Sequence, residues 1–146
     1  MTPEQILSQS FDTLAFPPDA AKWLLDVWRA IQVFDDIADG DSVARDDLDK
    51  TIWASLVGLQ LNPFHMQHGA ALVPVLAVQI LKWHGSDAVE RGGKADARSY
   101  MWRAGYYDLV LTVALIVHGP EKASLLAANI MGMYGETFED YMQEFS

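Results

Sequence analysis

The chain has no cysteine among its 146 residues. Disulfide bonds, thiolate chemistry and cysteine-ligated zinc are therefore excluded. Basic residues are also scarce, because 10 Lys and Arg stand against 20 Asp and Glu, which leaves a formal net charge of -10. A charge of that sign repels nucleic-acid phosphates and anionic lipid, so we expect no nucleic-acid partner.

Long apolar runs are missing as well, and we expect no targeting segment. The two longest apolar stretches are 69–81, which Pro74 and Gln79 interrupt, and 104–117, which Asp108 interrupts. Both fall short of the roughly 18 to 20 apolar residues that a membrane-spanning helix needs. The first residues have neither the basic nor the apolar region of a signal peptide. We therefore expect a cytoplasmic protein without a membrane span.

Sustained alternation of polar and apolar residues, which is typical of strands, is absent too. Apolar positions recur at three- and four-residue spacing instead, which indicates helices. The sequence predicts an all-α fold: a single-domain bundle of about five to seven helices over residues 1–146. The expected helices cover about 3–14, 18–38, 42–59, 63–84, 94–117 and 120–144.

Local signals set several of these helix ends. Thr2 and Asn62 each precede a proline, which is the pattern of a cap followed by the first helical residue. Gly40 follows the second helix at the position that a C-terminal glycine prefers, and Asp41 or Ser42 is expected to cap the third. Pro74 predicts a kink in the long central helix, or its division into two shorter helices.

An acidic segment covers the end of the second helix and the residues after it, since seven of the 20 acids lie between Asp35 and Asp49. At about 100° per residue, Asp35 and Asp39 flank the apolar face of this helix. Asp36 belongs to the opposite stripe, which is expected to be solvated and also holds Lys22, Asp26 and Arg29.

Acids in the last turn of a helix oppose its dipole, so their presence favours a function that needs the charge, such as cation binding. Asp35 and Asp39 are the candidate ligands, and Mg²⁺ suits one or two carboxylates plus phosphate oxygens. A calcium-binding loop fits less well, because its third position is Ile37. The alternative is an acidic, solvated helix end.

The run from Trp28 to Asp41, WRAIQVFDDIADGD, contains a DDxxD string. It resembles the aspartate-rich motif of class I isoprenoid synthases, in which a helix end presents aspartates to Mg²⁺ ions that hold a substrate diphosphate. The resemblance implies that Asp35 and Asp39 bind Mg²⁺, with Asp36 as an outward-facing helper. It also implies a diphosphate-bearing small molecule as ligand.

A second group of carboxylates would have to complete such a site. Asp108 and Thr112 have the spacing of the first two ligands in the second metal motif of that family, but the third position is Ile116. The Glu136 and Asp140 pair is the other candidate. The all-α nucleotide pyrophosphohydrolases, whose acidic pairs from two helices surround Mg²⁺, are an alternative resemblance with a more similar length.

Two further groups of residues have the chemistry of a site. Lys94, Arg98 and Arg103 are candidates for binding phosphate, or for pairing with the acidic segment. His65 and His68 are spaced to face one metal, although half-buried structural histidines have the same pattern.

The last two predicted helices are apolar over most of their circumference, which predicts a homodimer through helical faces. The residues expected to need cover are Tyr106, Tyr107, Leu109, Leu111, Leu115, Leu125, Ile130, Met131 and Met133. Beside the Mg²⁺ and diphosphate hypothesis, the sequence therefore also allows a non-enzymatic helical interaction or assembly protein with a merely acidic surface.

Overall fold

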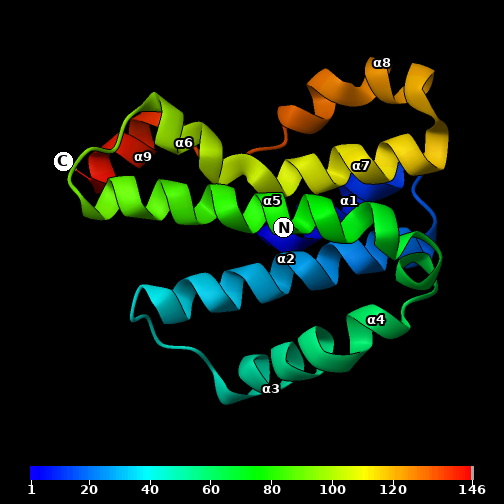
Figure 1. Cartoon of the computed structure of the whole chain (residues 1–146), viewed down its shortest axis with the longest axis horizontal. Coiled ribbons are helices and arrows are strands. Elements are labelled where there is room, and N and C mark those ends of the chain that lie inside the picture. Colours follow the sequence, from blue (N-terminus) through cyan, green and yellow to red (C-terminus); the bar gives the residue numbers. More distant parts are fainter. Residues whose placement is uncertain (146) are drawn as a thin grey trace. The chain divides into compact units, whose positions relative to one another are not determined.

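The structure of the protein, a computed structural model, describes residues 1–145. Helices make up 82% of the chain, and the described residues form no strand, which confirms the all-α prediction. The chain divides into two compact units, Met1–Gly69 and the part from Ala70 onward. Figure 1 labels the elements, and each unit is described by itself below.

The first unit begins with α1 (Pro3–Thr13) and α2 (Pro18–Ala38). Thr2 caps α1 as predicted, because its hydroxyl accepts from the Gln5 backbone N–H at 3.1 Å while the Gln5 side chain accepts from the Thr2 N–H at 2.9 Å. α2 has the predicted bounds. Its buried face consists of Ala20, Trp23, Leu24, Val27 and Ala30.

The third predicted helix starts later than expected. α3 (Arg45–Trp53) follows Ala44, so the prediction that Asp41 or Ser42 caps it is wrong. The reason is that Asp41 takes part in ending α2: its N–H donates to the Asp36 carbonyl at 2.9 Å, while Gly40, at φ +76°, donates to the Ile37 carbonyl. This is the glycine-dependent helix end that the sequence predicted at Gly40.

Beyond α3 the chain stays helical through a π-helical turn, η1 (Ala54–Gly58), and a short α4 (Leu59–Leu61). Asn62 then caps α5 (Pro63–Arg91), as predicted, because its side-chain oxygen accepts from the Phe64 N–H at 2.8 Å. The Asn62 side-chain nitrogen donates to the Asp19 carbonyl at 3.0 Å and so ties this cap to the start of α2.

α5 is longer than predicted. It continues through Pro74 and Gly85 to Arg91, so both an end near Gly85 and a division into two helices are wrong. The kink at Pro74 stays a prediction. The helix ends instead at Arg91, because Gly93, at φ +72°, turns the chain so that the N–H groups of Gly93 and Lys94 donate to carbonyls of the last turn.

The second unit continues with α6 (Ala97–Trp102), a 3₁₀ turn η2 (Arg103–Gly105) and α7 (Tyr106–His118), so the predicted helix over 94–117 is interrupted. The first of these helices, α6, starts later than the predicted residue 94, because Asp96 caps it by accepting from the N–H groups of Arg98 and Ser99. Gly119, at φ +82°, separates α7 from α8 (Pro120–Met131).

The helix predicted over 120–144 is also two helices, α8 and α9 (Phe138–Glu144). Tyrosines from earlier helices hold the segment between them: the Tyr100 hydroxyl donates to the Glu136 carbonyl at 2.5 Å, and the Tyr107 hydroxyl donates to the Met133 carbonyl at 3.2 Å. These carbonyls are satisfied outside a helix, which is why the helix can stop here.

A buried polar cluster lies within the second unit. The Glu90 side chain, only 4% exposed, accepts from Arg103 at 2.6 Å, from the Tyr141 hydroxyl at 2.7 Å and from the Ser86 hydroxyl at 3.0 Å. The Ser99 hydroxyl lies 2.7 Å from that of Tyr141. The cluster therefore links α5, α6, η2 and α9 through charge-assisted hydrogen bonds.

The apolar residues of the last predicted helices are only partly covered within the chain. Tyr106, Leu109 and Ile130 are buried, and only Leu115 and Leu125 of the nine listed above are exposed. Four are half-buried: Tyr107, Leu111, Met131 and Met133. Three of the nine are therefore fully covered within the chain and six are not, and the homodimer stays a prediction.

Candidate functional site

The predicted metal ligands lie at the C-terminal end of α2. Asp35 is half-buried in the last turn, and Asp39, which follows the helix, is exposed. Among the described residues, no group of three or more His, Asp or Glu side chains is arranged to hold a metal ion. The assignment of Asp35 and Asp39 to Mg²⁺ therefore gains no third ligand and stays a prediction.

Two of the three candidates for the second half of a metal site, Asp108 and Glu136, have side-chain partners. Asp108 accepts from the Lys82 ammonium at 2.7 Å, which satisfies a half-buried carboxylate. Glu136 accepts from the Tyr134 hydroxyl at 3.3 Å, and burial is the largest of the effects that raise the pKa of Glu136. Asp140 is exposed in the first turn of α9, and its N–H donates to the capping hydroxyl of Thr137.

Two of the three candidate phosphate-binding bases also have acidic partners. Arg103 pairs with Glu90, and Arg98 pairs with Asp96 at 3.0 Å. Lys94 is exposed after the end of α5. The pair of Arg103 is largely buried and gives it a structural role within the second unit, whereas the pair of Arg98 is exposed.

The two histidines have aromatic neighbours in the first unit. His65 accepts from the Trp23 indole N–H at 2.9 Å, and the ring of His68 lies 4.8 Å from that of Phe64. Both histidines are half-buried, which is the structural alternative that the sequence left open.

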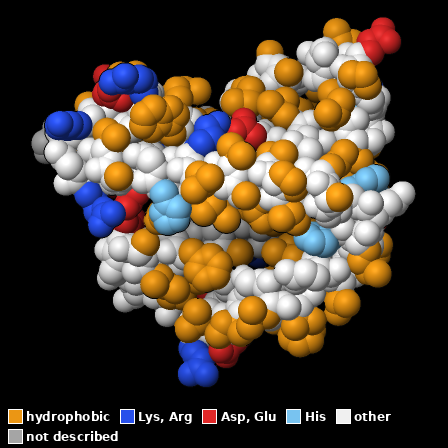
Figure 2. All heavy atoms as spheres, in the orientation of Figure 1, with side chains coloured by type: hydrophobic (Ala, Val, Ile, Leu, Met, Phe, Trp, Pro, Cys, Tyr) orange, Lys and Arg blue, Asp and Glu red, His pale blue; other side chains and the backbone are white. Residues whose placement is uncertain are grey.

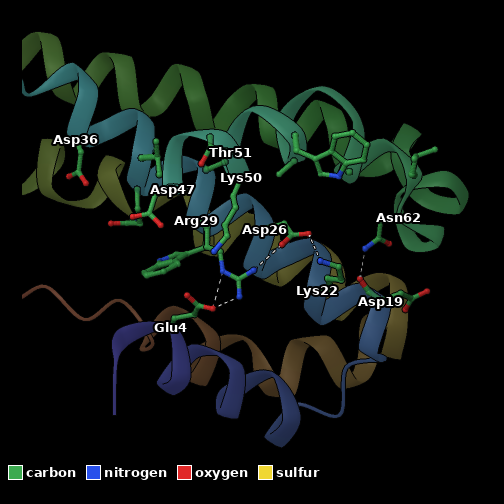
Figure 3. Close-up of a pocket in the computed structure, with 18 of the residues that line it drawn as sticks. Glu4, Asp19, Lys22, Asp26, Arg29, Asp36, Asp47, Lys50, Thr51 and Asn62 are labelled. Carbon is green, nitrogen blue, oxygen red and sulfur yellow. Dashed lines mark hydrogen bonds and ion pairs between the residues drawn. The ribbon is translucent and has the colours of Figure 1, made fainter. Parts of the chain in front are cut away.

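An open groove of about 1070 Å³ lies in the first unit between α2 and the segment from α3 to α4 (Figure 3). Asp36 lines this groove, whereas Asp35 and Asp39 do not. The stripe of α2 that was expected to be solvated therefore borders a groove, because α3 packs along that side of α2. The other stripe residues that line it are Lys22, Asp26 and Arg29.

The bases that line the groove are paired with acids. Lys22 and Arg29 both contact Asp26 at 3.0 Å, and Arg29 also binds Glu4, whose pKa this hydrogen bond lowers. A hydrogen bond to Asp46 at 2.9 Å raises the pKa of Lys50. The positive charges of the groove are therefore already compensated.

Sequence reasoning missed the facing wall of the groove, although a signal for it exists. The lining residues of this wall follow helical spacing across α3, η1 and α4: Asp47, Lys50, Thr51, Ala54, Gly58 and Leu61. Such a stripe marks one face of a continuous helix. The π-helical turn within it has no clear sequence signal, and such turns are frequent at functional sites.

In the second unit, the buried side of α5 is mostly polar, whereas its exposed side is apolar. Its buried residues after Leu72 are Gln79, Ser86 and Glu90. On the opposite side the apolar residues are exposed, and only 17% of the most apolar 18-residue window, with mean hydropathy 1.3, is buried. By length and composition alone this helix could cross a membrane, so the prediction of no membrane span stays a prediction.

No family model matches the chain, and neither a curated protein nor a solved structure is significantly similar to it.

Proposed function

We propose that this chain is a non-enzymatic helical assembly protein that pairs with a second copy of itself through the exposed side of α5. The observation that carries the proposal is the reversal of polarity on this helix. In the second unit its buried side holds Leu72 but otherwise the polar residues Gln79, Ser86 and Glu90, while the apolar Val73, Ile80 and Leu81 are exposed. A soluble helix normally turns its apolar side inward, so an exposed apolar side favours a missing partner.

The spacing on this side fits another helix. Ala70, Val73, Ala77, Ile80 and His84, here called the α5 seam, are all exposed and recur at intervals of three and four residues. This is the spacing by which two helices interlock side chains along a shared line. Small alanines alternate with larger Val73 and Ile80, which allows close approach of a partner helix.

Charge favours a second copy as that partner. Two chains that each carry -10 repel one another unless they meet where charge is absent. Residues 63–81 contain no Asp, Glu, Lys or Arg, and Figure 2 shows apolar side chains gathered where α5 runs in Figure 1. A two-fold axis near Ala77 would make the seam complementary to itself, as symmetric dimers require.

Light scattering coupled to gel filtration at micromolar concentration tests the proposal. The wild-type chain is expected at twice its mass of 16.2 kDa. Val73→Glu places a charge in the seam and is expected to give the monomer. Val78→Glu is the matched control, because Val78 is similarly exposed on the same helix but lies about 140° around it from Val73, and it should remain a dimer.

Three results would contradict the proposal. The first is a wild-type monomer, and the second is a Val73→Glu dimer as stable to dilution as the control. The third is wild-type protein that floats with neutral phosphatidylcholine vesicles and is monomeric in mild detergent, because α5 would then bind lipid instead of a second copy.

A further inference from the structure

The groove between α2 and the segment from α3 to α4 is a second surface whose shape and charge indicate a partner. It lies wholly in the first unit, and the α5 seam lies in the second. We infer that this groove binds a basic amphipathic helix of another protein. The inference does not depend on the proposed pairing of two copies.

The length of the groove fits a helix. Its lining residues on α2 run from Asp19 to Asp36, which spans about 26 Å at 1.5 Å per residue. Asn62 and Asp19 lie at one end and Asp36 and Asp47 at the other (Figure 3). A third helix laid between two neighbouring helices would follow the groove for about 17 residues.

The walls of the groove offer apolar contacts. Trp53 and Leu61 line it and are each 63% exposed, although both are large apolar side chains. Trp28 and Val33 line the facing side and are half-buried. Aromatic and aliphatic side chains of this kind anchor the apolar face of a bound helix.

The negative charge of the groove favours a partner helix with positive charge. Five acids line it against three bases, and all three bases already have acidic partners. The Asp36 carboxylate, by contrast, makes no hydrogen bond or ion pair with any described residue, and Asp47 lines the same end of the groove. Lysines or arginines of a partner helix would supply the missing positive charge, whereas an acidic partner would be repelled.

The probe is a synthetic helix of about 17 residues that places leucines at three- and four-residue spacing and lysines elsewhere. Fluorescence anisotropy of the labelled peptide with the full-length chain is expected to show binding that weakens as salt rises. Two peptides serve as controls: one has glutamate in place of every lysine, and the other has the same residues in an order without an apolar stripe.

Variants locate the binding site on the chain. Asp36→Asn with Asp47→Asn is expected to weaken binding of the lysine peptide about five- to tenfold, because two ion pairs with the peptide are lost. Asp41→Asn with Asp49→Asn removes the same charge from exposed positions outside the groove and should leave binding within about twofold. Trp53→Ala should weaken binding with little change in its salt dependence.

Specific outcomes would overturn the inference. They are no binding of the lysine peptide, equal binding of either control peptide, or equal weakening by the two pairs of aspartate substitutions. Val73→Glu separates this test from the one on assembly. A Val73→Glu monomer that still binds the peptide supports the groove whatever the outcome for the α5 seam.

Discussion

Removing the positive charge of the buried cluster tests how the second unit is held together. Arg103→Met deletes the only cation within the set of hydrogen bonds described around Glu90, whose side chain is 4% exposed. The bonds from Ser86 and Tyr141 to the same carboxylate remain. The variant therefore leaves a carboxylate out of water with two neutral donors and no counter-charge.

The expected decrease in the free energy of unfolding follows from the burial of the Glu90 carboxylate. Breaking a buried ion pair by removing one partner costs about 3 to 5 kcal/mol. The low end, about 3 kcal/mol, applies here, because the two hydroxyl donors persist and Arg103 is 21% exposed. For a chain of this length each kcal/mol shifts the melting temperature by about 2 to 4 °C, so we expect a decrease of about 6 to 12 °C.

Thermal unfolding followed by circular dichroism measures this decrease. Arg98→Met is the matched control, because Arg98 also pairs with a carboxylate but its side chain is 79% exposed, and its melting temperature should stay close to that of the wild type. Adding Glu90→Gln to Arg103→Met should recover part of the lost melting temperature, since the neutral amide needs no counter-charge. Equal melting temperatures for Arg103→Met and Arg98→Met would refute the reasoning.

Three further predictions concern other groups. The buried Gln79 side-chain oxygen has no hydrogen-bond partner among the described residues, so Gln79→Met should raise the free energy of unfolding by about 1 kcal/mol in urea titrations; a decrease would contradict this. Burial raises the pKa of Glu136, so its charged form costs more in the folded than in the unfolded chain. Stability should therefore fall as pH rises from about 4.5 through the raised pKa, and Glu136→Gln should remove that part of the fall in melting curves at about pH 4 and pH 7. If Asp35 and Asp39 bind Mg²⁺, millimolar Mg²⁺ should raise the melting temperature, more so with diphosphate, and substituting both by asparagine should abolish the shift while Asp36→Asn retains it. Absence of any cation-dependent shift in the wild type would exclude that site.

Helix ends with a local chemical cause could be predicted from the sequence. Thr2 and Asn62 cap the helices that the sequence assigned to them, and Gly40 ends α2 as expected. Capping depends on a side chain and a backbone group two or three residues apart, so the information lies within one short segment.

Ends that depend on distant residues could not be predicted. The segment between α8 and α9 is held by the Tyr100 and Tyr107 hydroxyls, and Tyr100 is 36 residues from the carbonyl that it binds. Gly85 keeps a helical backbone and lies within α5, whereas Gly93 adopts a positive φ and ends the helix. A glycine is compatible with both outcomes, so its type alone does not decide between them.

Features of the candidate surfaces likewise fall into those that the sequence predicts and those that depend on packing. The sequence by itself determined the helical class, the acidic segment at the end of α2 and the uncharged run 63–81, because composition and spacing are properties of the chain alone. Only the tertiary structure decided that Asp36 borders a groove and that α5 exposes its apolar side. Periodicity defines the faces of a helix, but packing decides which face is covered, since that depends on neighbours far away in the sequence.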